Sequence, residues 1–247
     1  MMEIKVDLSE VEMDGTNESG AIYIEVLNNG PYLVHGEPPV IQRFIETDDK
    51  GTSIAYRNGR SFEMKSAVAF CRCGHSKNAP YCDGHHAMID IDLKESATFT
   101  PLLDSAELII GSTVSLADNK SYCAFGRFCD AGKGVWNEVK ELGKVAEEIT
   151  EEIARNCPGG RLVVLSNDTK LPVDDILPPS IGLIEDPKEM CSGPLAVWGG
   201  IRVQSASGSS YEIRTRQALC RCGASSNKPF CDGTHARIDY KDGIAPE

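Results

Sequence analysis

The sequence predicts an α+β protein in which two β-rich units flank a smaller α+β insert. Residues 28–42 resemble residues 191–205, so part of the chain is repeated. Each copy is followed by a segment, bounded by glycine, in which apolar and polar residues partly alternate, a pattern typical of short strands. Between the copies, residues 135–156 carry apolar side chains at every third or fourth position, which predicts an amphipathic helix with an acidic outer face.

These features divide the chain into three parts. The first β-rich unit covers residues 1–98 and the second covers residues 188–247. The insert, 99–187, begins with a predicted strand at 107–116 and continues through a glycine-rich loop and the helix to a returning strand at 161–165. A linker with three prolines then leads to the second unit.

Composition restricts the classes of protein that fit. Of the 247 residues 41% are hydrophobic, which favours a folded protein, and no apolar run approaches the roughly 18 residues of a membrane span. A net charge of −12 argues against a nucleic-acid-binding surface and favours partners with basic docking surfaces. The start of the chain lacks the regions of a secretory signal. We therefore expect a cytoplasmic protein that binds neither membrane nor nucleic acid.

Ten cysteines need an explanation in a cytoplasmic chain, where clustered cysteines are more often ligands or catalysts than disulfides. Six of them lie in two copies of one motif, and the segments 70–87 and 219–236 are identical at 12 of 18 positions. Only one of the three histidines in the first copy recurs in the second. The repeated order C-x-C-x8-C-x3-H predicts one metal site in each copy, formed by Cys71, Cys73, Cys82 and His86 and by Cys220, Cys222, Cys231 and His235.

The residues between these ligands suit a metal loop. The aspartate after the third cysteine, Asp83 or Asp232, is expected to cap a short helix by accepting the amide hydrogen of the histidine three residues on. A glycine follows it in both copies, so backbone amides can approach the sulfur closely. Arg72 and Arg221, between the first two cysteines, either offset the charge of a metal centre or are solvated strand residues.

Both motifs resemble the signature of the CDGSH iron–sulfur (mitoNEET-type) family, C-x-C-x2-(S/T)-x3-P-x-C-D-G-x-H, and both satisfy every position. The resemblance implies two 2Fe–2S clusters. In each motif the first two cysteines bind one iron, and the third cysteine and the histidine bind the other. Single-motif members of the family are homodimers with intertwined strands. We therefore expect two β-rich CDGSH units that form an intramolecular pseudo-dimer in a monomer, although an open edge strand would allow dimerisation.

Alternatives for these sites stay open. A Cys3His set also suits structural zinc, whereas three cysteines do not pair evenly into disulfides. His75 and His85, which occur only in the first copy, are expected to be solvent-facing neighbours of the site. Because His85 is adjacent to His86, it remains the alternative to His86 as the fourth ligand of the first site.

The insert contains a second cysteine pattern. Cys123, Cys129 and Cys157 follow the order C-x5-C-x27-C-P and resemble the divergent single-cluster ferredoxins, with Gly126 where a middle cysteine would stand. Three cysteines imply a 3Fe–4S cluster, or a 4Fe–4S cluster with a fourth ligand that is not cysteine. The alternatives are Cys191 as the fourth ligand and a ferredoxin relic whose thiols hold no cluster.

The sequence contains no catalytic motif, neither a glycine-rich phosphate fingerprint nor G-x-S-x-G nor H-E-x-x-H, so we do not expect an enzyme. Electron transfer with a redox partner protein is the first hypothesis. The second is storage of clusters, their donation to acceptor proteins, or redox sensing, since a histidine ligand can be protonated off its metal. The third is a zinc-binding interaction module.

Overall fold

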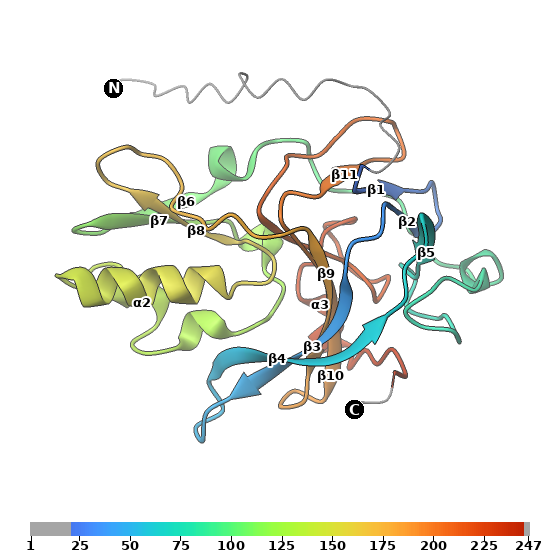
Figure 1. Cartoon of the computed structure of the whole chain (residues 1–247), viewed down its shortest axis with the longest axis horizontal. Coiled ribbons are helices and arrows are strands. Elements are labelled where there is room, and N and C mark those ends of the chain that lie inside the picture. The colour runs from blue at the N-terminus through green and yellow to red at the C-terminus, as the bar shows by residue number, and fades with distance from the viewer. Residues whose placement is uncertain (1–20, 245–247) are drawn as a thin grey trace.

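Two mixed β-sheets form the body of the protein, and a three-stranded sheet with a helix forms a lobe at one side of it (Figure 1). The computed structural model describes residues 21–244. Residues 1–20 of the first predicted unit, on which the expectation about a secretory signal rests, lie outside the described residues. The few helices and several sheets confirm the predicted α+β class.

The first sheet has the strand order β11-β1-β2-β5. Three of its strands come from the first repeat: β1 (Tyr23–Val26), β2 (Tyr32–His35) and β5 (Ala67–Phe70). The fourth, β11 (Arg202–Gln204), comes from the second repeat and pairs with β1 in parallel. The sheet is therefore completed by a strand from the other half of the chain.

The second sheet has the strand order β12-β10-β9-β3-β4. Its first three strands are β12 (Arg216–Leu219), β10 (Cys191–Trp198) and β9 (Ser180–Asp186). The other two, β3 (Val40–Thr47) and β4 (Ser53–Phe62), come from the first repeat, and β3 pairs with β9 in parallel. This sheet too takes strands from both halves.

The two sheets follow one plan. Strands β1, β2 and β5 correspond to β9, β10 and β12, and the added parallel strand is β11 in one sheet and β3 in the other. The registers agree, because Ile24 lies opposite Val203 in the first sheet and Ile181 lies opposite Val40 in the second. This exchange of strands is the intramolecular pseudo-dimer expected from the sequence. The second repeat begins at β9, inside the segment that the sequence predicts as linker.

The core lies between the two sheets. Residues of β1 and β2 alternate between buried and half-buried, so each strand presents one face to the core. Strand β10 is buried from Cys191 to Val197, as expected for a strand covered on both faces. The largest apolar cluster joins both halves and includes Ile24, Tyr32 and Val203 together with Leu195 and Val197.

The insert folds around its own small core. Strands β6 (Glu107–Ile110), β7 (Val114–Asp118) and β8 (Leu162–Ser166) form an antiparallel sheet. Helix α2 (Lys144–Arg155) packs against β8, and the one-turn helix α1 (Val135–Glu138) packs beside α2. The order strand, loop, helix and strand is as expected, and β8 confirms the predicted returning strand.

Two details of the insert differ from the expectations. The predicted strand at 107–116 is two strands, since the chain turns at Gly111, where an added Cβ would collide with the carbonyl oxygen of Val139. The predicted single helix at 135–156 is two helices, because Gly143 adopts a φ of 99° before α2 begins. The linking residue Leu142 is 85% exposed, so its helical spacing did not mark a buried position.

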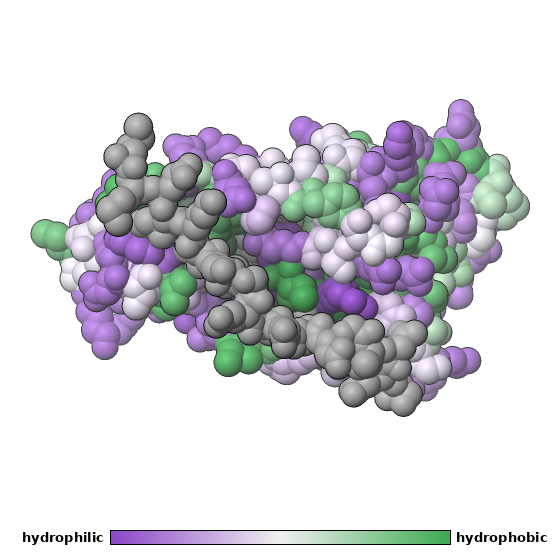
Figure 2. Space-filling model, turned by 90° about the horizontal axis from the view of Figure 1, so that it is seen from above, coloured by the Kyte–Doolittle hydropathy of each residue, from purple (hydrophilic) through white to green (hydrophobic). Residues whose placement is uncertain are grey.

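The remaining helices are single turns: η1 (His85–Ala87), η2 (Leu102–Ser105), η3 (Lys120–Tyr122), η4 (Phe128–Asp130) and α3 (Thr234–Arg237). Among the helices of residues 21–244, none has the length and apolar character needed to span a membrane. On the face shown in Figure 2, hydrophobic residues form small areas separated by hydrophilic ones.

The two motif loops lie against each other. At Gly74, which has a φ of 79°, an added Cβ would lie 2.8 Å from the carbonyl oxygen of Cys222. At the equivalent Gly223 it would lie 2.6 Å from the carbonyl oxygen of Cys73. The contact is reciprocal, as in a pseudo-twofold arrangement, and a side chain at either glycine would force the loops apart.

Replacing Gly74 by Ala is therefore expected to lower the free energy of unfolding more than replacing Gly208, a glycine with a φ of 88° and nothing within 4 Å. Both variants place a side chain at positive φ, at a cost of about 1 kcal/mol or more. Only Gly74→Ala also overpacks a backbone contact, which adds about 1–3 kcal/mol. Urea unfolding measures the difference, and equal losses in the two variants would contradict the loop-to-loop contact.

Candidate metal centres

Backbone hydrogen bonds bring the third cysteine of each motif back to the first. In the first motif the Cys71 amide donates to the carbonyl of Pro80, and the Cys82 amide donates to the carbonyl of Ala69, both at 2.8 Å. The two corresponding bonds of the second motif have the same length, 2.8 Å. The loop after β5 and the loop after β12 thus close in the same way.

A serine hydroxyl, half-buried in the first loop and buried in the second, shapes the turn inside each loop. The Ser76 hydroxyl donates to the carbonyl of Tyr81 at 2.6 Å and accepts the amide hydrogen of Asn78 at 3.1 Å. Ser225 makes the equivalent bonds at 2.7 and 3.0 Å. This pair of bonds explains why the motif carries a hydroxyl here, because an apolar side chain would leave both backbone groups unpaired.

The motif aspartate holds the loop in another way than expected. Asp83 accepts the amide hydrogen of His85, two residues on, at 3.0 Å and that of Lys77 at 2.9 Å. Asp232 makes the equivalent contacts in the second motif. The expected hydrogen bond from the amide of the histidine three residues on is wrong. The aspartate side chain instead closes a tighter turn over two residues and accepts a second hydrogen bond from the preceding part of the loop. The helical turn η1 begins after Gly84, with no side-chain cap.

The candidate ligands of each motif form two close pairs. In the first motif the sulfur atoms of Cys71 and Cys73 are 3.6 Å apart, and the Cys82 sulfur is 3.4 Å from Nδ1 of His86. The corresponding distances in the second motif are 3.7 and 3.3 Å. Two ligands of one tetrahedral metal would lie about 3.7 Å apart for two sulfurs and about 3.5 Å for sulfur and nitrogen. Each pair is thus spaced for one metal atom.

The four ligands of a motif do not gather around one point. Within residues 21–244 no group of three or more His, Cys, Asp and Glu side chains is placed to hold a single metal ion. The structure also separates the two candidate histidine ligands of the first motif. His86 faces Cys82, whereas His85 stacks on His75 with ring centres 6.3 Å apart. His75 is exposed, in keeping with the expectation of a solvent-facing neighbour.

Backbone amides point at the sulfur atoms. The Gly84 amide donates to the Cys82 sulfur at 3.4 Å, and Gly233 makes the same contact with Cys231. A hydrogen bond from the neighbouring Cys73 thiol lowers the pKa of Cys71, and the amide of Ser76 lowers it further against the effect of burial. These donors favour thiolates, the form of cysteine that binds metals. Burial acts in the opposite direction and raises the pKa of Cys82 and of Cys231.

The two sites differ in burial. In the second site all four candidate ligands are buried, and His235 is 4% exposed. In the first site Cys82 and His86 are half-buried. The insert causes the difference, since Gly233 packs against the backbone of Cys123 and Ala124 joins the apolar cluster of Cys231. Burial lowers the pKa of His235 to about 4, and the charge of Arg221 also lowers it.

The two motif arginines are both buried. Arg72 is 2% exposed and Arg221 is 4% exposed, so the alternative of solvated strand residues is wrong. Arg221 forms ion pairs with Glu185 at 3.0 Å and with Asp242 at 2.6 Å. Within residues 21–244, Arg72 donates one hydrogen bond, to the carbonyl of Leu27 at 3.2 Å.

The insert brings its three cysteines to one pocket. Cys123, Cys129 and Cys157 line it together with Phe128 and Arg161. Burial raises the pKa of Cys129 to about 12, and the charge of Asp130 also raises it. The alternative fourth ligand of the sequence, Cys191, lines a different cavity.

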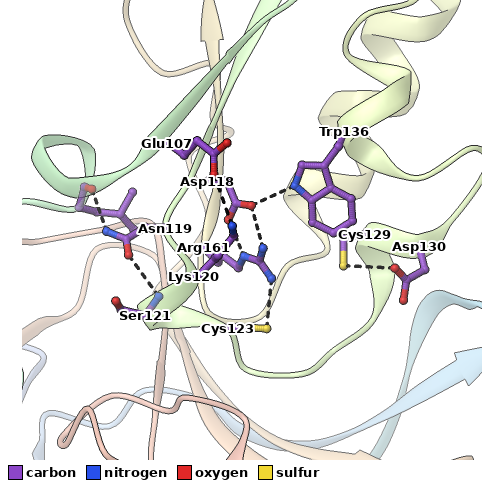
Figure 3. Close-up of polar contacts among 11 residues, drawn as sticks. Glu107, Asp118, Asn119, Lys120, Ser121, Cys123, Cys129, Asp130, Trp136 and Arg161 are labelled. Atoms are coloured by element: carbon purple, nitrogen blue, oxygen red, sulfur yellow. Dashed lines mark hydrogen bonds and ion pairs between the residues drawn. The ribbon is translucent and has the colours of Figure 1, made fainter.

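Arg161 is a residue of this pocket that sequence reasoning missed. Its guanidinium donates to the Cys123 sulfur at 3.3 Å and forms two bonds with Asp118, as Figure 3 shows. Burial would raise the pKa of Asp118, but the hydrogen bonds from Arg161 and Trp136 lower it below its usual value. Its place in the sequence could have identified it, because Arg161 directly follows the turn Cys-Pro-Gly-Gly that contains the third cysteine of the pocket.

Comparison with known proteins agrees with the repeated geometry. A family model described as the iron-binding zinc finger of CDGSH type matches residues 29–87 and 192–236, which contain the two motifs. Comparison with curated proteins and with solved structures found no match. The two matched regions bind iron in that family, and they coincide with the two loops described above. Two regions of the chain, one around each motif, thus match the CDGSH-type family, and this supports a CDGSH iron–sulfur domain protein with two CDGSH motifs.

Proposed function

We propose that each motif holds one 2Fe–2S cluster and that the protein transfers electrons to or from a partner protein without being an enzyme. The division of each ligand set into two close pairs carries this proposal. In a 2Fe–2S cluster each iron takes two protein ligands. Cys71 and Cys73 would then bind one iron and Cys82 and His86 the other, and the second motif would do the same through Cys220, Cys222, Cys231 and His235.

The same division weighs against structural zinc. A mononuclear zinc site needs four ligands around one atom, with every pair of ligands at similar spacing. Here the close spacings lie within the pairs, and the donor set of three thiolates and one imidazole suits iron–sulfur ligation.

The residues around each site have a defined role. A bound 2Fe–2S cluster would take up and release one electron. The amides of Gly84 and Gly233 would stabilise its negative charge through the sulfur atoms, and burial would keep His235 in the neutral form that binds metal. The net charge of −12 favours partners with basic docking surfaces. Since both sheets are completed within one chain, we propose a monomer.

Cluster transfer to an acceptor protein is the second candidate function. One observation favours it: Cys82 and His86 of the first site are half-buried, so an acceptor thiol has access to this pair of ligands. The second site offers no such access, because all four of its candidate ligands are buried.

We also propose a third cluster, of the 3Fe–4S type, bound by Cys123, Cys129 and Cys157. The pocket that these three cysteines share supports it. Arg161 supports it further, because a cationic donor at 3.3 Å from the Cys123 sulfur favours the thiolate.

Iron and acid-labile sulfide counting with EPR tests the number and type of clusters. Two 2Fe–2S clusters and one 3Fe–4S cluster give about seven iron atoms per chain, and the 3Fe–4S cluster gives an EPR signal in the oxidised state that 2Fe–2S clusters do not give. About four iron atoms without that signal would contradict a cluster in the insert. Stoichiometric zinc in a colourless protein would contradict both 2Fe–2S sites.

Acidification is expected to empty the two CDGSH sites in two steps, the first site before the second. Burial lowers the pKa of His235 to about 4, so this imidazole takes up a proton only when the pH falls close to that value. The pair of Cys82 and His86 is half-buried, so water and acid reach these two ligands more readily than the enclosed ligands of the second site. Visible absorbance recorded as the pH falls from 8 to 4 measures both steps.

Single ligand variants assign these steps. His86→Cys should move only the earlier step to lower pH, and His235→Cys should move only the later one, because a thiolate is released less readily than an imidazole. The two variants are matched controls for each other. A single step that neither substitution moves would contradict the ligand assignment.

A further inference from the structure

The arginine between the first two cysteines has the same backbone setting in both motifs. Arg72 donates to the carbonyl of Leu27 at 3.2 Å, and Arg221 donates to the carbonyl of Ile184 at 3.0 Å. Leu27 follows β1 and Ile184 lies in the corresponding β9, so these two bonds are equivalent. A difference between the arginines must therefore come from the other residues around them.

The charge of Arg221 is compensated twice. Its guanidinium reaches Glu185 at 3.0 Å and Asp242 at 2.6 Å, and its third nitrogen donates to the carbonyl of Gly193 at 3.0 Å. Every nitrogen of this buried guanidinium thus has an acceptor. With both carboxylates ionised, the group of three side chains carries one net negative charge.

The charge of Arg72 is not compensated by the residues that the structure describes. Its Nε and Nη2 atoms are buried and have no hydrogen-bond partner, and no carboxylate among residues 21–244 pairs with it. Its guanidinium lies 5.6 Å from the ring centre of Tyr32, a weaker cation–π contact. This group therefore carries one net positive charge in a buried position.

The sequence explains the difference. Counted along the corresponding strands β1 and β9, the position equivalent to Glu185 is Asn28, since Leu27 corresponds to Ile184 and the hairpin of β9 and β10 is longer than that of β1 and β2. The position equivalent to Asp242 is Leu93. The Leu93 amide donates to Asn29 and the Asp242 amide donates to Ser192, two bonds that match in the repeat. The first half thus has an amide and an apolar side chain where the second half has two acids.

We propose that this difference separates the reduction potentials of the two CDGSH sites and makes the first site the stronger electron acceptor. The inference rests on the proposed function, since it requires a cluster in each site. A buried cation beside a site favours an added electron and a net anionic group opposes it, with little screening in the protein interior. Solvent exposure acts in the same direction, because Cys82 and His86 are half-buried whereas the second site is enclosed.

The order of the centres follows from the same observations. The second site lies between the cysteine pocket of the insert, which reaches it through Cys123 and Gly233, and the first site, which reaches it through Gly74 and Cys222. An electron shared between the two CDGSH sites resides mainly on the first, whose Cys82 and His86 face the surface. The first site is therefore the place where a partner protein exchanges electrons with the chain.

Spectroelectrochemical titration of the intact protein with both clusters tests the inference. It is carried out at pH 8, above the pKa of about 7 that burial gives Glu185. We expect two one-electron steps separated by at least a tenfold difference in equilibrium constant, which is about 59 mV. Arg72→Gln should lower the potential of the upper step by about 59 mV, which is a tenfold change in its equilibrium constant, and leave the potential of the lower step unchanged. Glu185→Gln should raise the potential of the lower step and leave the potential of the upper step unchanged.

Two further variants separate charge from structure. Arg72→Lys keeps the positive charge and should keep the upper step near its original position, whereas a purely structural role of Arg72 would make Lys and Gln behave alike. Arg155→Gln, an exposed arginine on α2, is the control and should move neither step. If Arg72→Gln does not fold, Arg72→Lys and Glu185→Gln still locate the two steps.

The outcomes distinguish this inference from the function on which it rests. A protein without cluster absorbance contradicts the proposed function, and the inference with it. Two intact clusters with equal potentials, or a lower step that responds to Arg72→Gln, contradict the inference alone and leave the two 2Fe–2S sites as proposed.

Discussion

The exchange of one parallel strand between the two halves is the constraint on which the rest of the structure depends. Strand β11 completes the sheet of β1, β2 and β5, and strand β3 continues the sheet of β9, β10 and β12. Strands paired in this way cannot separate without exposing unpaired backbone groups and opening the shared core. The motif loops that follow β5 and β12 are consequently held against each other, with glycine at the point of contact because the loop backbones leave no room for a side chain.

A symmetric frame here carries two unequal sites. The loops have the same hydrogen bonds and the same ligand spacing, whereas their surroundings differ. The insert encloses the second site through Cys123 and Ala124, and acidic residues surround its arginine. The first site keeps an open side and a buried cation, Arg72, that has no acidic partner among residues 21–244. Two copies within one chain can diverge in this way because each position is encoded separately, whereas the two halves of a homodimer share every substitution.

The parts of this structure that could be predicted from the sequence are those with strict local chemistry. The order and spacing of Cys71, Cys73, Cys82 and His86 allow few arrangements, and their repetition locates the second site. The helix break at Gly143 and the turn at Gly111 were missed because apolar periodicity continues across both glycines. Burial of the second site, the partners of Arg221 and the role of Arg161 depend on contacts between distant segments, which no local pattern encodes.

The placement of β11 has a consequence for how the protein is made. Strands β1, β2 and β5 and the whole first motif leave the ribosome before residues 202–204, which complete their sheet. The first half is thus synthesised with an open strand edge and without the backbone of Cys222 that supports its metal loop. Domains that fold as they emerge usually do so from the N-terminus onward. In this chain the first site acquires its final shape only after most of the second half has been translated, so the cluster that we propose for it would be loaded late in biogenesis.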